Sequence, residues 1–169
     1  MTQLGSEIDT AFRHFYSTGP IHGDWASWAD SFTADAKYHD PHRGAAVGPE
    51  AIRELVESSL AGSIPVYSPL VWYAADGDRV AFRSVHRADR PDGRGIAAEF
   101  TSTTILTYAG GGRWSDMDCW WLLPERKKFV REYLRAREQP GPVPDPAVPR
   151  DVRRDPQTPA GVLGAVPQR

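Results

Sequence analysis

The sequence is short of cysteine, of long apolar runs and of excess positive charge. Its single cysteine, Cys119, excludes an internal disulfide and is typical of a reducing compartment. No apolar run approaches the roughly 20 residues that span a bilayer, and residues 1–10 lack the features of a secretory signal. Lys and Arg number 20 against 22 Asp and Glu, so no basic surface for nucleic acid is expected. These absences predict a cytoplasmic protein with neither a nucleic-acid nor a membrane partner.

Two kinds of ligand site are also missing from the sequence. It contains no Gly-rich phosphate loop and no dinucleotide fingerprint. His39, Asp40 and His42 lie close together in the chain. However, His39 and Asp40 would point to opposite faces of a strand, and no third ligand follows at a suitable spacing. We therefore expect neither a metal nor a cofactor.

The composition divides the chain at about residue 138. Residues 139–169 hold eight of the 15 prolines and no aromatic residue. Such a segment buries too little apolar surface to offset the entropy of ordering it, so a disordered tail is expected. Residues 1–138 are long enough to form one domain with a substantial core.

The periodicity of apolar residues predicts an α+β fold. Helical spacing recurs in three N-terminal segments and once near the end, and strand-like runs lie between them. Short turns such as Asp76–Asp78 and Ala109–Gly112 join four successive strands into an antiparallel meander. The helices would cover one face of a curved sheet. The predicted helices are 6–18, 24–32, 49–60 and 124–137, and the predicted strands are 37–40, 66–74, 79–87, 96–108 and 113–122.

One stretch places a carboxylate between two helices. Trp25, Trp28 and Phe32 recur at i, i+3 and i+7, which makes one apolar helix face. The strand after this helix ends at Asp40, because the proline that follows keeps Asp40 extended. The loop 41–47 comes next and is expected to be mobile. The end of this strand is therefore the first place to look for chemistry.

The residues GDWASWADSFTADAKYHDPHRG and GPEAIREL in this region resemble the SnoaL-like polyketide cyclases and the ketosteroid isomerases. Both groups belong to the nuclear transport factor 2-like superfamily. The resemblance covers about residues 6–122. It implies a cone-shaped, curved sheet that encloses one pocket with three N-terminal helices, and a final helix outside the shared fold. The superfamily contains isomerases, cyclases, dehydratases, epoxide hydrolases and non-catalytic modules, so the resemblance specifies fold better than function.

The resemblance also implies roles for particular residues. The general base of the ketosteroid isomerases corresponds to Asp40, and their oxyanion-binding tyrosine corresponds to Tyr16. Their second oxyanion donor, a protonated aspartate, corresponds to Thr104, whose hydroxyl is a weaker donor. The cyclases use an acid on the last strand, for which Asp118 is the nearest candidate. The resemblance turns Met117 and its alternate neighbours inward, so Asp118 reaches the pocket only if a bulge shifts the register.

Further residues are expected around the pocket. His86 shares a strand face with Phe82, so it would line the pocket as a proton shuttle or a hydrogen-bond donor; the alternative is a core histidine. Asp40 has an alternative as well: it could only cap its loop, by accepting from backbone N–H groups near His42 and Arg43. Residues expected to contact an apolar, flat substrate are Phe82, Thr104, Met117, Trp121 and Trp28.

Together these features predict a cofactor-free isomerase or cyclase that uses Asp40 on a small apolar carbonyl compound, such as a polyketide or steroid-like ring. The chain is expected to be a homodimer. The alternative is a non-catalytic module of the same fold that binds a small ligand or dimerises. Epoxide hydrolysis ranks last, because it requires an Asp-Arg-Asp set around a water and Arg83 has the wrong strand parity.

Overall fold

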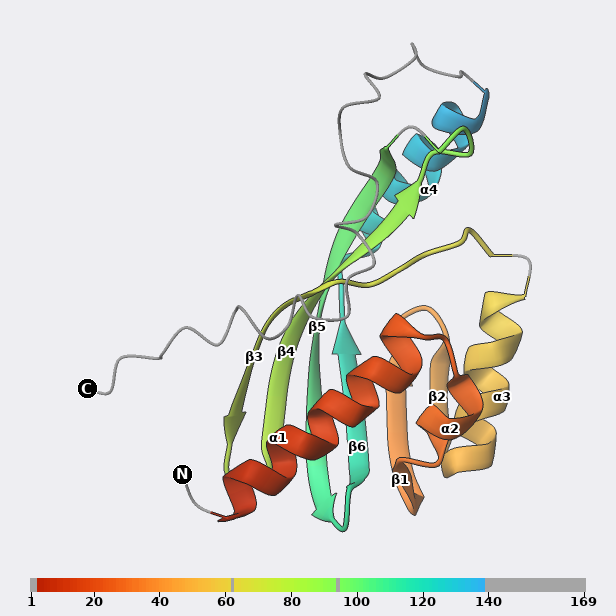
Figure 1. Cartoon of the computed structure of the whole chain (residues 1–169). Coiled ribbons are helices and arrows are strands. Elements are labelled where there is room, and N and C mark those ends of the chain that lie inside the picture. The colour runs from red at the N-terminus through yellow and green to blue at the C-terminus, as the bar shows by residue number, and fades with distance from the viewer. Residues whose placement is uncertain (1–2, 62, 94, 139–169) are drawn as a thin grey trace.

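The protein is built on one curved six-stranded sheet with helices against its inner face. The computed structural model describes residues 3–61, 63–93 and 95–138, so the tail predicted at 139–169 lies outside the described residues. The sheet and its covering helices confirm the predicted α+β class (Figure 1). The strands are β1 (Phe32–Asp40), β2 (Gly44–Val47), β3 (Leu70–Asp76), β4 (Arg79–Asp89), β5 (Ile96–Gly110) and β6 (Arg113–Trp120). The helices are α1 (Gln3–Tyr16), α2 (Trp25–Ala29), α3 (Pro49–Leu60) and α4 (Leu123–Glu138), and a π-helical turn, η1, follows α1 over Ser17–Ile21.

Strands β3 to β6 form the predicted antiparallel meander. The sheet order is β2-β1-β6-β5-β4-β3, and each step from β3 to β6 is antiparallel. Gly77 closes the β3–β4 turn at φ 58°, a backbone conformation that glycine adopts without steric cost. Strand β1 pairs in parallel with β6, which brings the N-terminal half of the chain beside the end of the meander.

The second predicted helix is shorter than expected, and the strand after it is longer. Helix α2 ends at Ala29, and β1 begins at Phe32 rather than at Lys37. The Ser31 hydroxyl donates to the Trp28 carbonyl at 2.6 Å, a local bond that competes with continuation of the helix. Phe32 is buried as the first inward residue of the strand, so its helical spacing from Trp28 was misleading.

The loop expected at 41–47 is largely a strand. Residues Gly44–Val47 form β2, which pairs with β1 from Asp40 to Lys37 in an antiparallel hairpin. Four small residues show no hydrophobic alternation, so the sequence carried no strand signal here. The hairpin matters for the site, because it holds the end of β1 between two hydrogen-bonded strands.

A π-helical turn carries the chain from α1 to α2. It runs through Pro20, where an α-helix had been expected to end. A Cβ atom on Gly19 would lie 2.4 Å from Cδ1 of the Trp28 ring, so this position requires glycine. The close approach lets Trp28 pack with only 2% of its surface exposed, against Phe15 and Phe32.

Two apolar clusters hold the sheet and helices together. Helix α1 crosses the sheet in Figure 1 and buries Ile8, Phe12 and Phe15 in the main core. Helix α4 lies at the far end of β4 and β5, where Phe129 packs against Ala88 and Ala98 in a second, smaller core. No helix in the described part of the chain is long and apolar enough to cross a bilayer.

Candidate functional site

A cavity of about 190 Å³ opens between the two cores. Its walls come from α2, α3, the end of β1, the inner face of β4 to β6, and α4. The volume lies below the range of about 300–1,000 Å³ typical of drug-sized ligands, so a small molecule would fill it. Aromatic and aliphatic side chains dominate the lining. All five residues expected to contact a substrate line it, namely Trp28, Phe82, Thr104, Met117 and Trp121.

Asp40 lies at the cavity wall where β1 ends, with 5% of its surface exposed. Its Oδ1 accepts hydrogen bonds from the backbone N–H groups of His42, at 2.8 Å, and Arg43, at 2.9 Å. Its Oδ2 lies 3.7 Å from Nη1 of Arg43. Thus Oδ1 caps the turn, as the structural alternative predicts, while Oδ2 pairs with the Arg43 guanidinium at the cavity. All the partners are donors, which suits an ionised carboxylate that acts as an acceptor.

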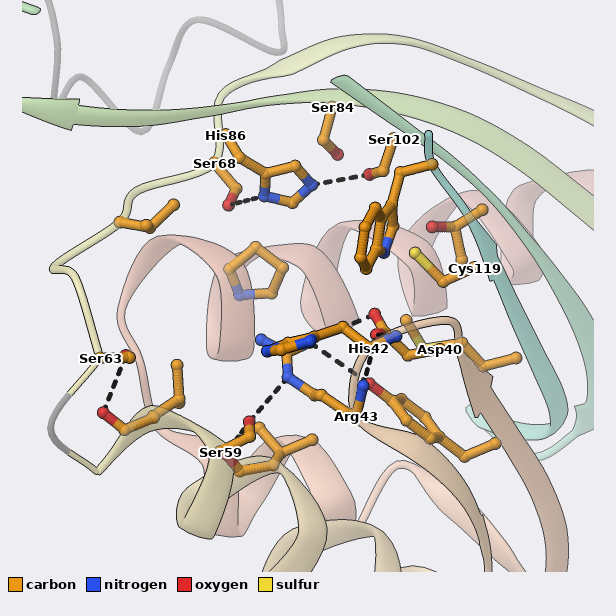
Figure 2. Close-up of a pocket in the computed structure, with 18 of the residues that line it drawn as sticks. Asp40, His42, Arg43, Ser59, Ser63, Ser68, Ser84, His86, Ser102 and Cys119 are labelled. Carbon is orange, nitrogen blue, oxygen red and sulfur yellow. Dashed lines mark hydrogen bonds and ion pairs between the residues drawn. The ribbon is translucent and has the colours of Figure 1, made fainter. Parts of the chain in front are cut away.

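Arg43 is a site residue that sequence reasoning did not place in the cavity. Its Nε donates to the Ser59 hydroxyl at 2.8 Å and its Nη1 donates to the Tyr38 hydroxyl at 3.3 Å. These bonds tie the β1–β2 turn to α3 and hold the guanidinium beside Asp40 (Figure 2). Burial raises the pKa of Tyr38 to about 12, so its phenol stays protonated. Only the i, i+3 spacing of Asp40 and Arg43 across a turn could have signalled the pair.

His86 occupies the opposite wall, as Figure 2 shows. Its Nδ1 pairs with the Ser68 hydroxyl at 2.8 Å, its Nε2 pairs with the Ser102 hydroxyl at 2.7 Å, and its ring stacks on Phe100. Burial, together with the charges of Arg43 and Arg126, lowers the pKa of His86 to about 4. At neutral pH the ring is therefore uncharged, with one nitrogen that donates and one that accepts.

Small polar groups complete this wall. Ser84, Ser102 and Thr104 are buried and line the cavity, so the inner face of β4 and β5 presents a row of hydroxyls. Cys119 lies beside Thr104, and burial raises the pKa of its thiol to about 11. A protonated thiol is a poor nucleophile, which agrees with a packing role for Cys119.

Tyr16 is not among the described residues that line the cavity, although it lies just behind them. Its hydroxyl donates to the Ser68 carbonyl at 2.6 Å and pairs with the Ser84 hydroxyl at 2.9 Å. Burial raises the pKa of Tyr16, which keeps the phenol protonated. The hydroxyl therefore braces the cavity wall from behind and does not converge with Asp40 on one space.

Asp118 lies on the outer face of β6. Its Oδ1 is 2.9 Å from Nδ1 of His39, which also faces outward. The register of β5 and β6 is regular from Met117 to Cys119, so no bulge turns Asp118 inward. Its neighbours Met117 and Cys119 line the cavity instead. The structure thus separates Asp118 from Asp40, His86 and the other predicted site residues.

Asp40 is the only carboxylate among the described residues that line the cavity. A second acid of an Asp-Arg-Asp set is missing from that lining, and Arg83 is exposed on the outer face, where it donates to Thr101. No group of three His, Cys, Asp or Glu side chains within residues 3–61, 63–93 and 95–138 could hold a metal ion. The polar groups of the described cavity lining are one acid, two histidines (His42 and the neutral His86), two arginines and several hydroxyls.

The SnoaL-like domain pattern matches residues 12–117 of the sequence, which is more than half of the chain. The chain belongs to the SnoaL-like domain family. The match includes Asp40, His86 and all but one of the residues expected to contact a substrate, and it ends before Trp121 and α4. No curated protein sequence is recognisably similar to this SnoaL-like chain.

Solved structures agree with the family at the level of the fold. A nuclear transport factor 2-like protein of unknown function from Burkholderia pseudomallei superimposes with a TM-score of 0.61 at 11% identity, over 73% of this chain and 97% of that one. TerC, co-crystallized with polyporic acid, has a TM-score of 0.61 at 14% identity, over 74% and 98%. SalBIII, an epoxide hydrolase/cyclase-like enzyme with a role in pyran ring formation in salinomycin, has a TM-score of 0.59 at 19% identity, over 73% of this chain and 97% of that one. These identities are low, so the likeness shows a shared fold.

Proposed function

We propose that this SnoaL-like domain is a cofactor-free isomerase or cyclase in which Asp40 takes a proton from carbon in a small carbonyl compound. One observation carries the proposal. Asp40 is the single carboxylate among the described lining residues, at the end of a strand, in a cavity otherwise lined mainly by apolar groups. A base positioned beside the proton that it takes contributes about 10²- to 10⁴-fold in rate.

The second oxygen of Asp40, Oδ2, which lies 3.7 Å from Nη1 of Arg43, would perform the proton transfer. Oδ1 is held by two backbone N–H groups, which leaves Oδ2 to accept a proton from the carbon next to the carbonyl. The C–H electrons then form a C=C bond while the π electrons of the carbonyl move to its oxygen, which gives an enolate. Return of the proton at another carbon completes an isomerisation. Attack of the enolate carbon on a second carbonyl, whose oxygen then takes the proton from Asp40, completes a cyclisation.

The opposite wall would hold the enolate oxygen. His86 is neutral and both of its ring nitrogens bond to serines, so it would act through the Ser102 hydroxyl, which it orients. The hydroxyls of Ser102 and Thr104 lie on the same wall, and donors fixed before the reaction stabilise charge as it develops. This assignment replaces Tyr16, whose hydroxyl bonds to Ser68 and Ser84 behind the wall. The salinomycin enzyme SalBIII, of similar fold, acts in ring formation, which supports cyclisation as one outcome.

The test uses Asp40→Asn and a probe ketone. We expect the wild-type protein to catalyse deuterium exchange at the acidic carbon of 2-tetralone in heavy water, followed by proton NMR. Asp40→Asn keeps an oxygen for the turn but cannot act as a base, and exchange should fall by about 10²-fold or more. Asp118→Asn is the matched control on the neighbouring strand and should retain full exchange. An Asp40→Asn protein with undiminished exchange would refute the assignment.

A non-catalytic ligand-binding module is the second candidate, because the bonds of Asp40 to its own turn are also those of a structural cap. In that case the wild-type protein would bind 2-tetralone without catalysing exchange. Asp40→Asn would then lower the melting temperature and leave no rate to change.

A further inference from the structure

The last helix places a second arginine at the cavity. Arg126 belongs to α4, outside the residues that the SnoaL-like pattern matches, and it lines the cavity with Arg43 and His86. Its guanidinium lies over two aromatic rings, 5.6 Å from the centroid of Phe100 and 5.3 Å from that of Phe129. Cation–π contacts of this kind hold the planar group in a fixed orientation.

Arg126 carries a charge that the described protein leaves unbalanced. Arg43 is committed to Asp40, Ser59 and Tyr38, whereas Arg126 has no ion-pair partner within residues 3–61, 63–93 and 95–138. Its Nη1 is buried and has no hydrogen-bond acceptor in the same part of the chain. The described lining therefore holds two guanidiniums and a single carboxylate.

A partly buried cation with an unsatisfied Nη1 is costly, and a bound anion would offset that cost. Burial lowers the pKa of Arg126, and the charge of Arg43 lowers it further while Asp40 raises it, which indicates that the two guanidiniums and the carboxylate act on one space. His86 is neutral, so it supplies neither an anion nor a further positive charge. The unsatisfied guanidinium of Arg126 is suited to bind a carboxylate, since its planar set of N–H donors matches two carboxylate oxygens.

We propose that Arg126 binds a carboxylate of the substrate, so that the cavity takes a flat, mostly apolar carbonyl compound with one acidic group. That the substrate contains a carbonyl rests on the proposed function, whereas the carboxylate is inferred from Arg126 independently of it. Helix α4 is then part of the binding site, because it supplies both the arginine and the Phe129 ring that orients it. Specificity for an acid would come from a residue beyond the shared SnoaL-like pattern.

Two probes of the same shape test this inference by isothermal titration calorimetry: 2-naphthoate, which is anionic, and 2-naphthamide, which is neutral. We expect the wild-type protein to bind the carboxylate about tenfold or more tightly than the amide, the range of a hydrogen bond to a charged group. Arg126→Gln should reduce this preference to about twofold or less, with the amide bound as before. Arg126→Lys should retain part of the preference, because it keeps the charge but not the fork.

The control variant is Arg131→Gln, which removes the same charge from an exposed position of the same helix and should leave both affinities unchanged. Equal wild-type affinity for the two probes, or no measurable binding of 2-naphthoate at millimolar concentration, would overturn the inference. So would loss of both probes in Arg126→Gln, because Arg126 would then only shape the cavity. Asp40→Asn should keep the preference, so a failure of the proposed proton transfer leaves this result intact.

Discussion

Tyr16 offers a direct way to separate bracing of the cavity from chemistry inside it. In the ketosteroid isomerases that this chain resembles, the corresponding tyrosine binds the oxyanion. Here its hydroxyl bonds to the Ser68 carbonyl and the Ser84 hydroxyl, two residues that line the cavity, while Tyr16 itself is not among the described lining residues. We predict that Tyr16→Phe weakens the fold and changes the proton-exchange rate only slightly.

The magnitude follows from the two bonds that are lost. Ser84 is 3% exposed and would be left without its phenol partner, while the Ser68 carbonyl would lose a 2.6 Å bond. Leaving buried polar groups unsatisfied costs about 1–3 kcal/mol, so we expect a loss of about 2 kcal/mol in the free energy of unfolding. For a domain of this size that corresponds to a fall in melting temperature of roughly 5–10 °C.

The assay is a double-mutant cycle measured by urea unfolding. Tyr16→Phe, Ser84→Ala and the double variant should show an interaction energy of about 1 kcal/mol, because the two hydroxyls bond to each other. Exchange of 2-tetralone by Tyr16→Phe should stay within about threefold of the wild-type rate, whereas loss of an oxyanion donor typically costs about 10²- to 10³-fold. A fall of that size with an unchanged melting temperature would refute the bracing role and return Tyr16 to the chemistry.

The other two predictions concern pH and assembly. The pKa of His86 is lowered to about 4 in the folded protein from 6.5 when unfolded, so the unfolded chain binds a proton first as the pH falls. The contribution of His86 to the free energy of unfolding should be fully present above about pH 6.5 and should decline towards pH 4 by up to about 3 kcal/mol. Urea unfolding of His86→Asn should show a shallower decline with falling pH. Equal declines in the wild-type protein and the variant would contradict this prediction. We also propose a homodimer through the outer sheet face, where Trp72, Ile105 and Trp120 are exposed; Trp120 is 57% exposed. Sedimentation should show a dimer that Trp120→Glu converts to a monomer, and a monomeric wild-type protein would exclude this interface.

The sequence alone determined the features that depend on neighbouring residues. The meander follows from turn residues such as Gly77 and from runs of β-branched and aromatic residues, and Asp40 is kept extended by the proline after it. The resemblance of the chain to the family, together with strand parity, predicts that Asp40, Phe82 and His86 face one pocket, and all three line the cavity. Local propensity and hydrophobic period were sufficient to predict the turns and strands, because each depends on residues only a few positions apart in the sequence.

Only the tertiary structure decided what meets across the fold. Arg43 joins Asp40 because a hairpin that no pattern predicted turns the chain back, and Arg126 reaches the cavity because α4 packs on the ends of β4 and β5. Tyr16 corresponds to the oxyanion donor of the ketosteroid isomerases, yet its hydroxyl bonds to the Ser68 carbonyl and the Ser84 hydroxyl, and Tyr16 is not among the described lining residues. Such placements depend on packing between segments up to about a hundred residues apart, and no local signal in the sequence records them.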